Sequence, residues 1–369
     1  MKIIEINFFL GGGGASRLMV DLCNQFAKNQ NNQVIAVAVV EQKSSGNDYI
    51  SFINDLDSKV HYIALNAKSG LCFKSLLGIF RLIKKEEPDV VHLHSNILLL
   101  LLPALFCHKT RYVHTIHTLV TRQYPGGLIK QIAHWLYRKG LIQPVTISNE
   151  CHESYLECFG SKDDILITNG RAALQTTDRV PDVGKELTLL GIGDGSPVFI
   201  HVARHHPVKN HDRLFSTFNR LSDEGVNYHL LVIGDHYDDY KKRVVNNKHI
   251  HLLGPKTNIG DYMSFAHFFV LSSDKEGLPL SMLEAMSMGV IPVSTPAGGI
   301  KDVIRNNVNG FMGQEVSDEC FYKTVKRAIG HGKDISKDAI VKEYQEKYSM
   351  EICADNYMKC YKHNTLKNA

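Results

Sequence analysis

One strand–loop–helix stretch constrains the fold more than any other part of this sequence. The apolar run His267–Ser273 is typical of a buried strand, and a polar loop follows it. Pro279 stands where a helix can begin, because the first helical turn does not use the N–H group that proline lacks. We predict a helix over Pro279–Met288 that Gly289 ends, followed directly by a second buried strand. Strands joined in this way predict an α/β fold with a parallel sheet.

Two glutamates frame the start of this predicted helix. Glu276 lies just before it, and Glu284 lies about 7–8 Å along the helix axis from Pro279. The unpaired N–H groups and the positive end of the helix dipole lie between them and form a site for an anion. A bound anion would therefore have a carboxylate on either side, able to accept hydrogen bonds from hydroxyl groups. A sugar nucleotide has its parts in that order: sugar hydroxyls, diphosphate, ribose hydroxyls.

These residues resemble the signature of retaining glycosyltransferases of the GT-B type, in the "glycosyl transferases group 1" (family 4-like) class. The matching segments are Glu276-Gly-Leu-Pro279, Leu283-Glu-Ala-Met286, Gly289–Ser294, Thr295–Ile304 and Asn309-Gly-Phe311. Two glutamates at this spacing also occur by chance on solvated surface helices. The two buried strands and the Pro and Gly boundaries around them favour the functional interpretation.

Length and composition describe a globular protein with two domains. A chain of 369 residues is too long for one ordinary core, and 44% hydrophobic with 22% charged residues is typical of soluble proteins. The longest apolar run, Ile97–Cys107, is too short to span a bilayer and suits a buried helix. Met1–Leu10 contains Glu5 and indicates a first strand rather than a signal peptide. The eight cysteines are scattered, so we expect reduced thiols in a cytoplasmic protein.

A glycine loop follows the first predicted strand. Such a loop lets backbone N–H groups at the start of a helix approach a phosphate closely. A dinucleotide-binding fingerprint is an alternative, with Glu41 as the acid that binds ribose, but Ser16 occupies its third glycine position. The loop matches the glycosyltransferase pattern at least as well, although that pattern usually has Glu at the position of Ser16. The resemblance implies that Gly13 and Gly14 bind the donor.

Histidines stand at the ends of two further predicted strands. His92 and His94 end one strand, and His114 and His117 end the next. Two residues i and i+2 on a strand share a face, so a zinc cluster is conceivable, but no spacing of cysteines or carboxylates supports it. The resemblance implies instead that His117 faces the donor sugar. His92 and His94 match a motif of the family more loosely and are interpreted as structural.

A pair of cations follows the first strand of the second half. After the buried strand Pro197–Ala203 come Arg204 and Lys209, on the loop before the next helix. An arginine can hold a diphosphate through its planar fork and a lysine as a point charge. This element resembles the Gly-Arg…Lys-Asn element of the family, with Ala203 in place of the glycine.

Basic residues are concentrated in one part of the chain. Residues 59–149 contain 12 Lys and Arg against 3 Asp and Glu, a net charge of +9. Within them, Leu128–Ile142 predicts a basic amphipathic helix with the only tryptophan, Trp135. Such a helix can lie on an anionic membrane, but a helix packed on its own domain would have the same pattern. Both interpretations stay open.

The resemblance implies two Rossmann-like domains that face each other across a cleft. The expected divisions are an acceptor-side domain over residues 1–175 with a returning C-terminal helix over 349–369, a linker over 176–196, and a nucleotide-sugar-binding domain over 197–348. The activity would be transfer of a sugar, with retention, to a hydroxyl of a glycan or lipid-linked acceptor, as in surface polysaccharide biosynthesis. An epimerase or phosphorylase of the same fold and a non-catalytic nucleotide-sugar-binding protein are the alternatives.

The expected site uses side chains and backbone groups without a cofactor. The catalytic residues would be His117, Glu276, Arg204 and Lys209, and the donor-binding residues Gly13, Gly14, Arg204, Lys209, Glu276, Gly277, Leu278 and Glu284. Asp55-Leu-Asp57 resembles the metal-binding Asp-x-Asp of another glycosyltransferase fold, but it precedes a strand, and we expect a solvated turn there. We therefore expect no metal and no nucleic acid partner. The enzyme would be cytoplasmic and could contact the inner face of an anionic cell membrane.

Overall fold

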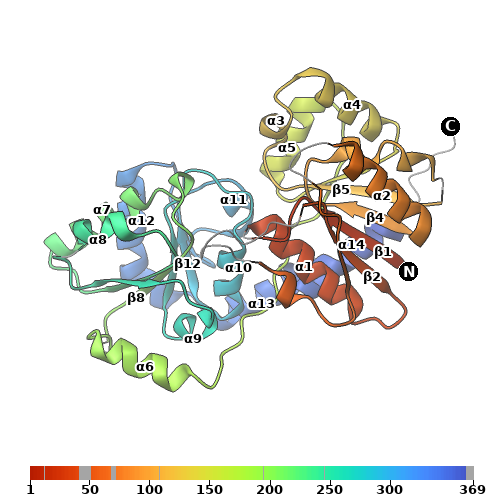
Figure 1. Ribbon diagram of the computed structural model, residues 1–369. Coiled ribbons are helices and arrows are strands. Elements are labelled where there is room, and N and C mark those ends of the chain that lie inside the picture. Colours follow the sequence, from red (N-terminus) through yellow and green to blue (C-terminus); the bar gives the residue numbers. More distant parts are fainter. Residues whose placement is uncertain are drawn as a thin grey trace. The chain divides into compact units, whose positions relative to one another are not determined.

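The computed structural model describes residues 1–11, 13–40, 51–67, 72–107, 109–193, 195–244 and 246–362 (Figure 1). The chain divides into two compact units. Unit 1 consists of Met1–Arg171 and Met350–Ala369, and unit 2 of Ala172–Ser349. Glu41, the alternative ribose-binding acid, lies outside the described residues.

Unit 1 is built on a seven-stranded sheet in the order β3-β2-β1-β4-β5-β6-β7, with every pair parallel. The strands are β1 Lys2–Asn7, β2 Gln33–Ala38, β3 His61–Ala64, β4 Val90–Leu93, β5 Arg111–Ile116, β6 Gln143–Thr146 and β7 Ile165–Leu166. The order reverses between β1 and β4, where Glu5 pairs with His92. Open α/β sheets bind ligands beyond the carboxyl ends of the strands at such a reversal.

Helices flank this sheet on both sides (Figure 1). They are α1 Gly14–Ala27, α2 Phe73–Glu86, α3 Val120–Gln123, α4 Gly127–Arg138, α5 Asn149–Phe159 and α14 Met350–Lys362, with 3-10 helices η1 Ile53–Asp55, η2 Leu98–Leu101 and η3 Ala104–Phe106. The apolar run Ile97–Cys107 was expected to form one helix. It forms η2 and η3 instead, because Pro103 lacks the N–H group that a continuous helix needs there. Within the described ranges, no helix combines the length and the apolarity needed to cross a bilayer.

The last helix belongs to the first unit, as expected. Helix α14 packs against α1 and buries Tyr357 and Tyr361. The hydroxyl of Tyr357 lies 2.9 Å from the hydroxyl of Thr115 on β5. The hydroxyl of Tyr361 donates a hydrogen bond of 2.9 Å to Glu5 on β1. The C-terminal helix is therefore part of the polar interior of unit 1.

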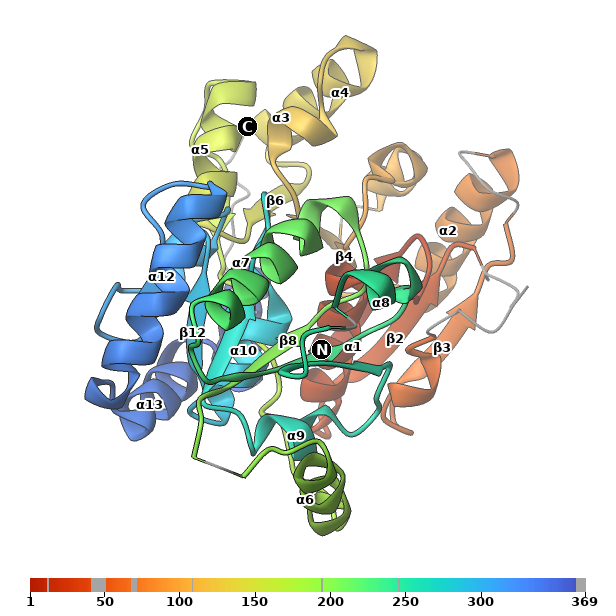
Figure 2. The same cartoon turned by 90° about the vertical axis from the view of Figure 1, so that its left-hand side faces the viewer.

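Unit 2 repeats the same arrangement with a six-stranded parallel sheet in the order β10-β9-β8-β11-β12-β13. Its strands are β8 Val198–Val202, β9 His229–Ile233, β10 Ile250–Gly254, β11 Phe268–Leu271, β12 Ile291–Ser294 and β13 Phe311–Met312. Its helices are α6 Val180–Leu189, α7 His211–Asp223, α8 Asp238–Val244, α9 Ile259–Met263, α10 Leu280–Ser287, α11 Ile300–Val303, α12 Asp318–His331 and α13 Lys337–Lys347, with η4 Pro207–Lys209 and η5 Gly332–Asp334. Helices α7 and α12 lie side by side (Figure 2), and α10 packs against α13.

The predicted linker over 176–196 contains a packed helix. Val183 and Leu187 of α6 are buried one helical turn apart, a spacing that the polar composition of this segment concealed. Glu186 accepts a hydrogen bond from Tyr262 and pairs with Lys256. The segment is therefore part of unit 2 and not a loose connection.

A buried carboxylate on α13 stabilises the loop between α11 and β13. Glu343 accepts hydrogen bonds from Asn309 at 2.9 Å, Arg305 at 2.7 Å and Lys347 at 2.9 Å. The chain is tightly packed here, because a Cβ at Gly310 would lie 2.6 Å from the carbonyl oxygen of Pro292. Burial alone would raise the pKa of Glu343, but the hydrogen bonds outweigh burial and lower the pKa.

We expect Glu343→Gln to destabilise unit 2 by about 1–3 kcal/mol at pH 7, because charge-assisted hydrogen bonds are lost. A lowered pKa in the folded state stabilises the protein at pH values above the ordinary carboxyl range, and this stabilisation disappears as the pH falls through the folded pKa. Urea unfolding followed by circular dichroism should therefore show a lower free energy of unfolding for the variant than for the wild type, and this difference should shrink below about pH 4.5. Glu346→Gln, on the exposed side of the same helix, is the matched control and should change little. Equal effects of the two variants on the free energy of unfolding would contradict the stabilising role of Glu343.

Candidate functional site

The two loops predicted to bind the donor lie at the reversal of strand order in unit 2. Strands β8 and β11 are hydrogen-bonded neighbours, with Phe199 opposite Phe268. Both run in the same direction, so the loops that follow them leave the same edge of the sheet. The first loop carries Arg204 and Lys209, and the second carries Glu276. The structure thus brings together residues that are 67 positions apart in the chain.

Lys209 and Glu276 are in direct contact. The ammonium of Lys209 lies 2.7 Å from Oε1 of Glu276, and the hydroxyl of Ser273 donates a hydrogen bond of 2.5 Å to the same oxygen. The side chain of Glu276 is 9% exposed and that of Lys209 is 24% exposed. A nearly buried carboxylate therefore faces a cation that solvent can still reach.

A second set of polar contacts holds the two loops together. Arg213, buried at the start of α7, donates hydrogen bonds to the carbonyl of Ser272 at 2.8 Å and to Asp274 at 2.7 Å. Asn210 donates to the same carboxylate and caps α7 by accepting from the Arg213 N–H group at 3.1 Å. The hydroxyl of Ser272 donates to the carbonyl of Lys209 at 2.9 Å. These contacts fix the backbone on either side of the Lys209–Glu276 pair.

This supporting set was not predicted from the sequence. Asn210 just before a helical segment is an N-cap signal that could have been read from the chain. Arg213 gave no such signal, because an arginine near a helix start is usually solvated. Only the fold shows that its guanidinium points to the end of β11.

Helix α10 begins one residue later than predicted. Pro279 is its N-cap, with φ −70° and ψ 116°, and Leu280 is the first helical residue. No side chain caps this end, so the first N–H groups of the helix are not used by a capping residue. Gly277 accepts a hydrogen bond of 2.7 Å from Gly299, which anchors the loop just before the helix.

The other predicted donor-binding residues of unit 2 lie around this helix start. Leu278 is buried next to Pro279, and half-buried Glu284 lies on α10 itself. Arg204 is exposed on the loop after β8. All six predicted residues of unit 2 therefore belong to two neighbouring loops and one helix, which together offer two cations, two carboxylates and a helix N-terminus.

The remaining predicted residues belong to unit 1. Gly13 is the N-cap of α1 with φ 152°, a conformation that favours glycine, and Gly14 is the first helical residue. Ser16 is buried, accepts a hydrogen bond from Asn7 and donates one to the carbonyl of Phe9. At this position, which departs from the family pattern, the side chain therefore stabilises the loop after β1. His117 follows β5 directly, and its Nε2 lies 3.2 Å from Nδ1 of His94.

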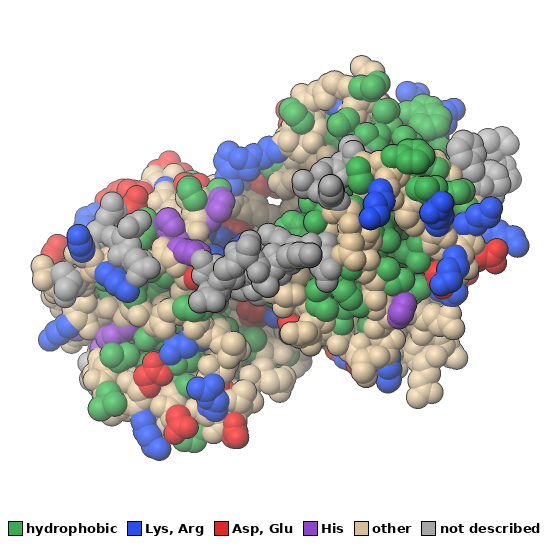
Figure 3. Space-filling view, viewed as in Figure 1, with side chains coloured by type: hydrophobic (Ala, Val, Ile, Leu, Met, Phe, Trp, Pro, Cys, Tyr) green, Lys and Arg blue, Asp and Glu red, His purple; other side chains and the backbone are tan. Residues whose placement is uncertain are grey.

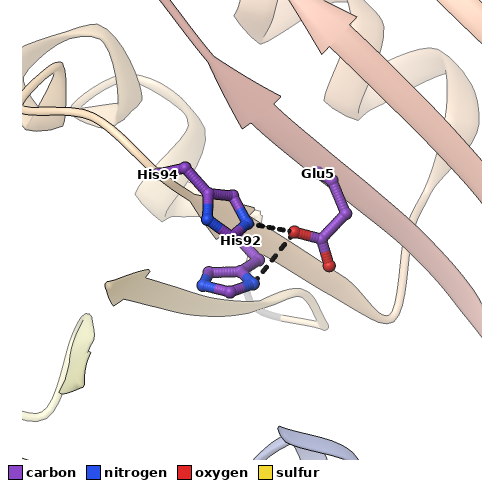
Figure 4. Close-up of side chains that lie close together, drawn as sticks. All are labelled: Glu5, His92 and His94. Atoms are coloured by element: carbon purple, nitrogen blue, oxygen red, sulfur yellow. Dashed lines mark hydrogen bonds and ion pairs between the residues drawn. The ribbon is translucent and has the colours of Figure 1, made fainter. Parts of the chain in front are cut away.

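Two histidines hydrogen-bond to one buried carboxylate of unit 1. Nδ1 of His92 lies 2.9 Å and Nε2 of His94 lies 2.6 Å from one oxygen of buried Glu5 (Figure 4). The fold thus brings a carboxylate to these two histidines, although no spacing in the sequence indicated it. His114 bonds instead to the hydroxyl of Tyr137 at 2.6 Å.

Asp55 and Asp57 have local structural partners. The carboxylate of Asp55 pairs with Arg17, and that of Asp57 accepts a hydrogen bond of 2.9 Å from the Lys59 N–H group. This arrangement agrees with the expected turn and differs from a pair of carboxylates directed at one ion.

Comparison with known proteins extends the resemblance to nearly the whole chain. The family described as Glycosyltransferase Family 4 matches residues 12–169, and the family described as Glycosyl transferases group 1 matches residues 187–347. The boundary between the two matches lies close to the boundary between the two units.

Two curated relatives transfer sugars to diphosphoundecaprenol-linked sugars. The UDP-Gal:alpha-D-GlcNAc-diphosphoundecaprenol alpha-1,3-galactosyltransferase of Escherichia coli is 27% identical over 65% of this chain and 66% of its own. The N,N'-diacetylbacillosaminyl-diphospho-undecaprenol alpha-1,3-N-acetylgalactosaminyltransferase of Campylobacter jejuni is 23% identical over 66% of each chain. The chain thus spans slightly less than two thirds of the length of either relative.

Solved structures share the fold over the full length. A glycosyltransferase of Rickettsia africae superposes with a TM-score of 0.77 at 17% identity and covers 100% of this chain and 99% of that one. Anabaena HepE in complex with UDP and glucose has the same TM-score at 15% identity, with coverage of 98% and 99%. These neighbours have the GT-B fold, and so does this protein. The chain belongs to the group 1, family 4-like glycosyltransferases.

Proposed function

We propose that this protein transfers a sugar from a nucleoside-diphosphate sugar to a hydroxyl of a lipid-linked saccharide, with retention at the anomeric carbon. The observation that carries the proposal is the Lys209–Glu276 pair beside the uncapped start of α10. A cation, a carboxylate and the N–H groups of a helix start without a side-chain cap, all on two neighbouring loops and one helix, match the diphosphate and hydroxyls of such a donor.

Each residue of unit 2 has a separate role in this proposal. Lys209 and Arg204 neutralise the diphosphate, and the N–H groups at the start of α10 add hydrogen bonds to it. Glu276 accepts hydrogen bonds from the transferred sugar, and Glu284 accepts them from the ribose. As the sugar leaves, negative charge grows on the diphosphate, and groups held in place before the reaction stabilise that charge best.

Retention is proposed from the resemblance to retaining glycosyltransferases, and it requires no protein nucleophile. The acceptor attacks from the side that the diphosphate leaves, and a departing phosphate oxygen takes the acceptor's proton. Lys209 and Arg204 can neutralise the diphosphate charge that a divalent metal would otherwise neutralise. We therefore propose that the reaction is metal-independent. His117 and the Gly13-Gly14 loop of unit 1 would contact the donor sugar and the phosphate, as the resemblance implies.

The acceptor is proposed from two observations. The relatives described above act on sugars linked to diphosphoundecaprenol. In addition, α4 buries Ala133, Leu136 and Tyr137 against unit 1 but leaves Leu128 and Trp135 exposed. Trp135 is 54% exposed.

Basic residues accompany these exposed apolar side chains on α4 and also occur on α2. Lys130, Arg138 and Lys139 lie on or next to α4, and Lys and Arg side chains follow one another over the surface formed by α2 (Figure 3). Apolar side chains that can enter a bilayer, together with cations that meet lipid phosphates, fit a surface of anionic lipid. A lipid-linked acceptor would then reach unit 1 at the membrane.

Two substitutions separate binding of the diphosphate from contact with the sugar. We expect Lys209→Ala to weaken UDP binding by roughly 1.5–3 kcal/mol, because a charge-assisted hydrogen bond is lost. Glu276→Ala should leave UDP affinity unchanged or higher, since it releases Lys209, but should strongly lower turnover with the sugar nucleotide. Calorimetry with UDP and steady-state kinetics measure the two effects.

Lys256→Ala is the matched control for Lys209→Ala. Lys256 is also 24% exposed and also pairs with a glutamate of unit 2, but it follows β10 and belongs to neither of the two loops. Its removal should not change UDP affinity. Equal affinities of Lys209→Ala and Lys256→Ala would remove the support for a diphosphate site at these loops.

The reaction itself is tested with nucleotide sugars and a polyprenyl-diphosphate-linked sugar in excess EDTA. We expect transfer to continue under chelation, because the fixed cations stabilise the leaving diphosphate, and NMR of the product should show the anomeric configuration of the donor. Loss of transfer under EDTA would contradict metal independence, and an inverted product would contradict retention. Epimerisation or phosphorolysis without use of the acceptor would contradict the proposed transfer.

Membrane contact is tested with vesicles that contain anionic phospholipid. We expect sedimentation with these vesicles that decreases with salt, because exposed charges are screened. Leu128→Ser should weaken it further by removing an apolar side chain that is 70% exposed. The control is Leu189→Ser, which changes an exposed leucine of unit 2. If the two variants sediment alike, α4 is not the contact.

A further inference from the structure

We propose that Glu5 and His94 are positioning residues that hold His117 in one tautomer, with Nε2 protonated and Nδ1 free to accept. The chain of contacts runs from the carboxylate of Glu5 to His94 and from His94 to His117. It lies where the strand order of unit 1 reverses, with Glu5 on β1 and His94 directly after β4. Its catalytic consequence rests on the proposed function, whereas the tautomer itself does not.

The first step is the charge of Glu5. Its side chain is fully buried, and it receives hydrogen bonds from His94 at 2.6 Å and from the Tyr361 hydroxyl at 2.9 Å. Burial alone would raise its pKa, but the interactions with His92 and His94 outweigh burial and lower the pKa to about 2. Glu5 is therefore a carboxylate near neutral pH, and a carboxylate can only accept hydrogen bonds.

The second step fixes the proton of His94. Its Nε2 faces the carboxylate, so Nε2 must be the protonated nitrogen. Burial and the neighbouring His92 lower the pKa of His94 to about 4, so the ring is neutral at pH 7. In a neutral imidazole the other nitrogen carries a lone pair. Nδ1 of His94 is therefore an acceptor.

The third step transfers this constraint to His117. Nε2 of His117 lies 3.2 Å from the accepting Nδ1 of His94, and the two rings are stacked with centroids 5.4 Å apart. Nε2 of His117 must then donate. Burial and the nearby His94, His92 and His114 lower the pKa of His117 well below its ordinary value, so this ring is also neutral. Its Nδ1 is left as an acceptor.

The consequence is a selection of hydrogen-bond type. A neutral His117 with an accepting Nδ1 can receive a hydrogen bond from a hydroxyl, but it cannot donate to an ether or carbonyl oxygen through that nitrogen. The buried carboxylate thus determines, through two imidazoles, which kind of group can hydrogen-bond to Nδ1 of His117. A ring nitrogen is commonly oriented in this way by the hydrogen bond of the other nitrogen.

Ring ¹⁵N NMR of the full chain tests the tautomers directly. With ¹⁵N-histidine label, the two-bond proton–nitrogen pattern should identify His94 and His117 as neutral Nε2–H rings at pH 7. His94→Asn and His117→Asn assign these signals among the 19 histidines. An Nδ1–H pattern for His117, or a charged ring, would overturn the proposal without any variant of Glu5.

A variant of Glu5 tests whether the carboxylate is the cause. In Glu5→Gln the amide can donate as well as accept, so His94 and His117 should become mixtures of tautomers. Tyr357→Phe is the control, because it removes a hydrogen bond to Thr115 in the same interior but leaves Glu5, His94 and His117 in place. In Tyr357→Phe, the tautomers of His94 and His117 and the turnover should remain those of the wild type. A pure Nε2–H signal for His117 in Glu5→Gln would contradict the role of the carboxylate.

Kinetics separate the catalytic consequence from the tautomer. Glu5→Gln should lower kcat by roughly tenfold or more, because a donor replaces an acceptor in part of the molecules, and should leave UDP affinity unchanged. A change of tautomer with unchanged kcat would refute the catalytic role. If no transferase activity is found in the wild type, the proposed function fails, and the NMR result still decides the tautomer.

Discussion

The reversal of strand order is the constraint on which both units depend. When consecutive strands are added first on one side of a starting strand and then on the other, the loops after the two central strands diverge and leave room between them. In unit 2 these strands are β8 and β11, and in unit 1 they are β1 and β4. Every polar cluster that matters to the proposed chemistry lies at one of these two positions.

The carboxylates at this position have different surroundings in the two units. In unit 2 the carboxylate of Glu276 pairs with Lys209, whose ammonium remains partly open to solvent. In unit 1 the carboxylate of Glu5 is fully buried and is surrounded by histidines and by Tyr361 of the last helix. A buried charge is stable only with several hydrogen bonds, and the return of α14 supplies one of them. The last helix is therefore part of the chemistry of unit 1 as well as of its packing.

Much of the fold, and the grouping of the candidate site residues of unit 2, could be predicted from the sequence, because both depend on local patterns. The strand before Glu276 and the glycine after α10 can be recognised from the few residues around them. The last helix was expected on unit 1. Features that depend on contacts over long distances were not predicted. The guanidinium of Arg213 finds Asp274 only in the fold, and Glu5 was noted only as a charge in an apolar strand. The helix around Val183 and Leu187 was hidden by polar neighbours.

The Lys209–Glu276 contact also explains how the protein could bind a complete sugar nucleotide more favourably than a nucleoside diphosphate alone. If the ammonium turns toward phosphate, the nearly buried carboxylate of Glu276 loses a partner and keeps only the hydroxyl of Ser273. A buried carboxylate without sufficient partners is costly, and sugar hydroxyls can replace the hydrogen bond that Lys209 withdraws. The diphosphate and the sugar would then favour each other's binding through one shared ion pair. Specificity for an intact sugar nucleotide would thus arise from a contact that is already present in the ligand-free protein.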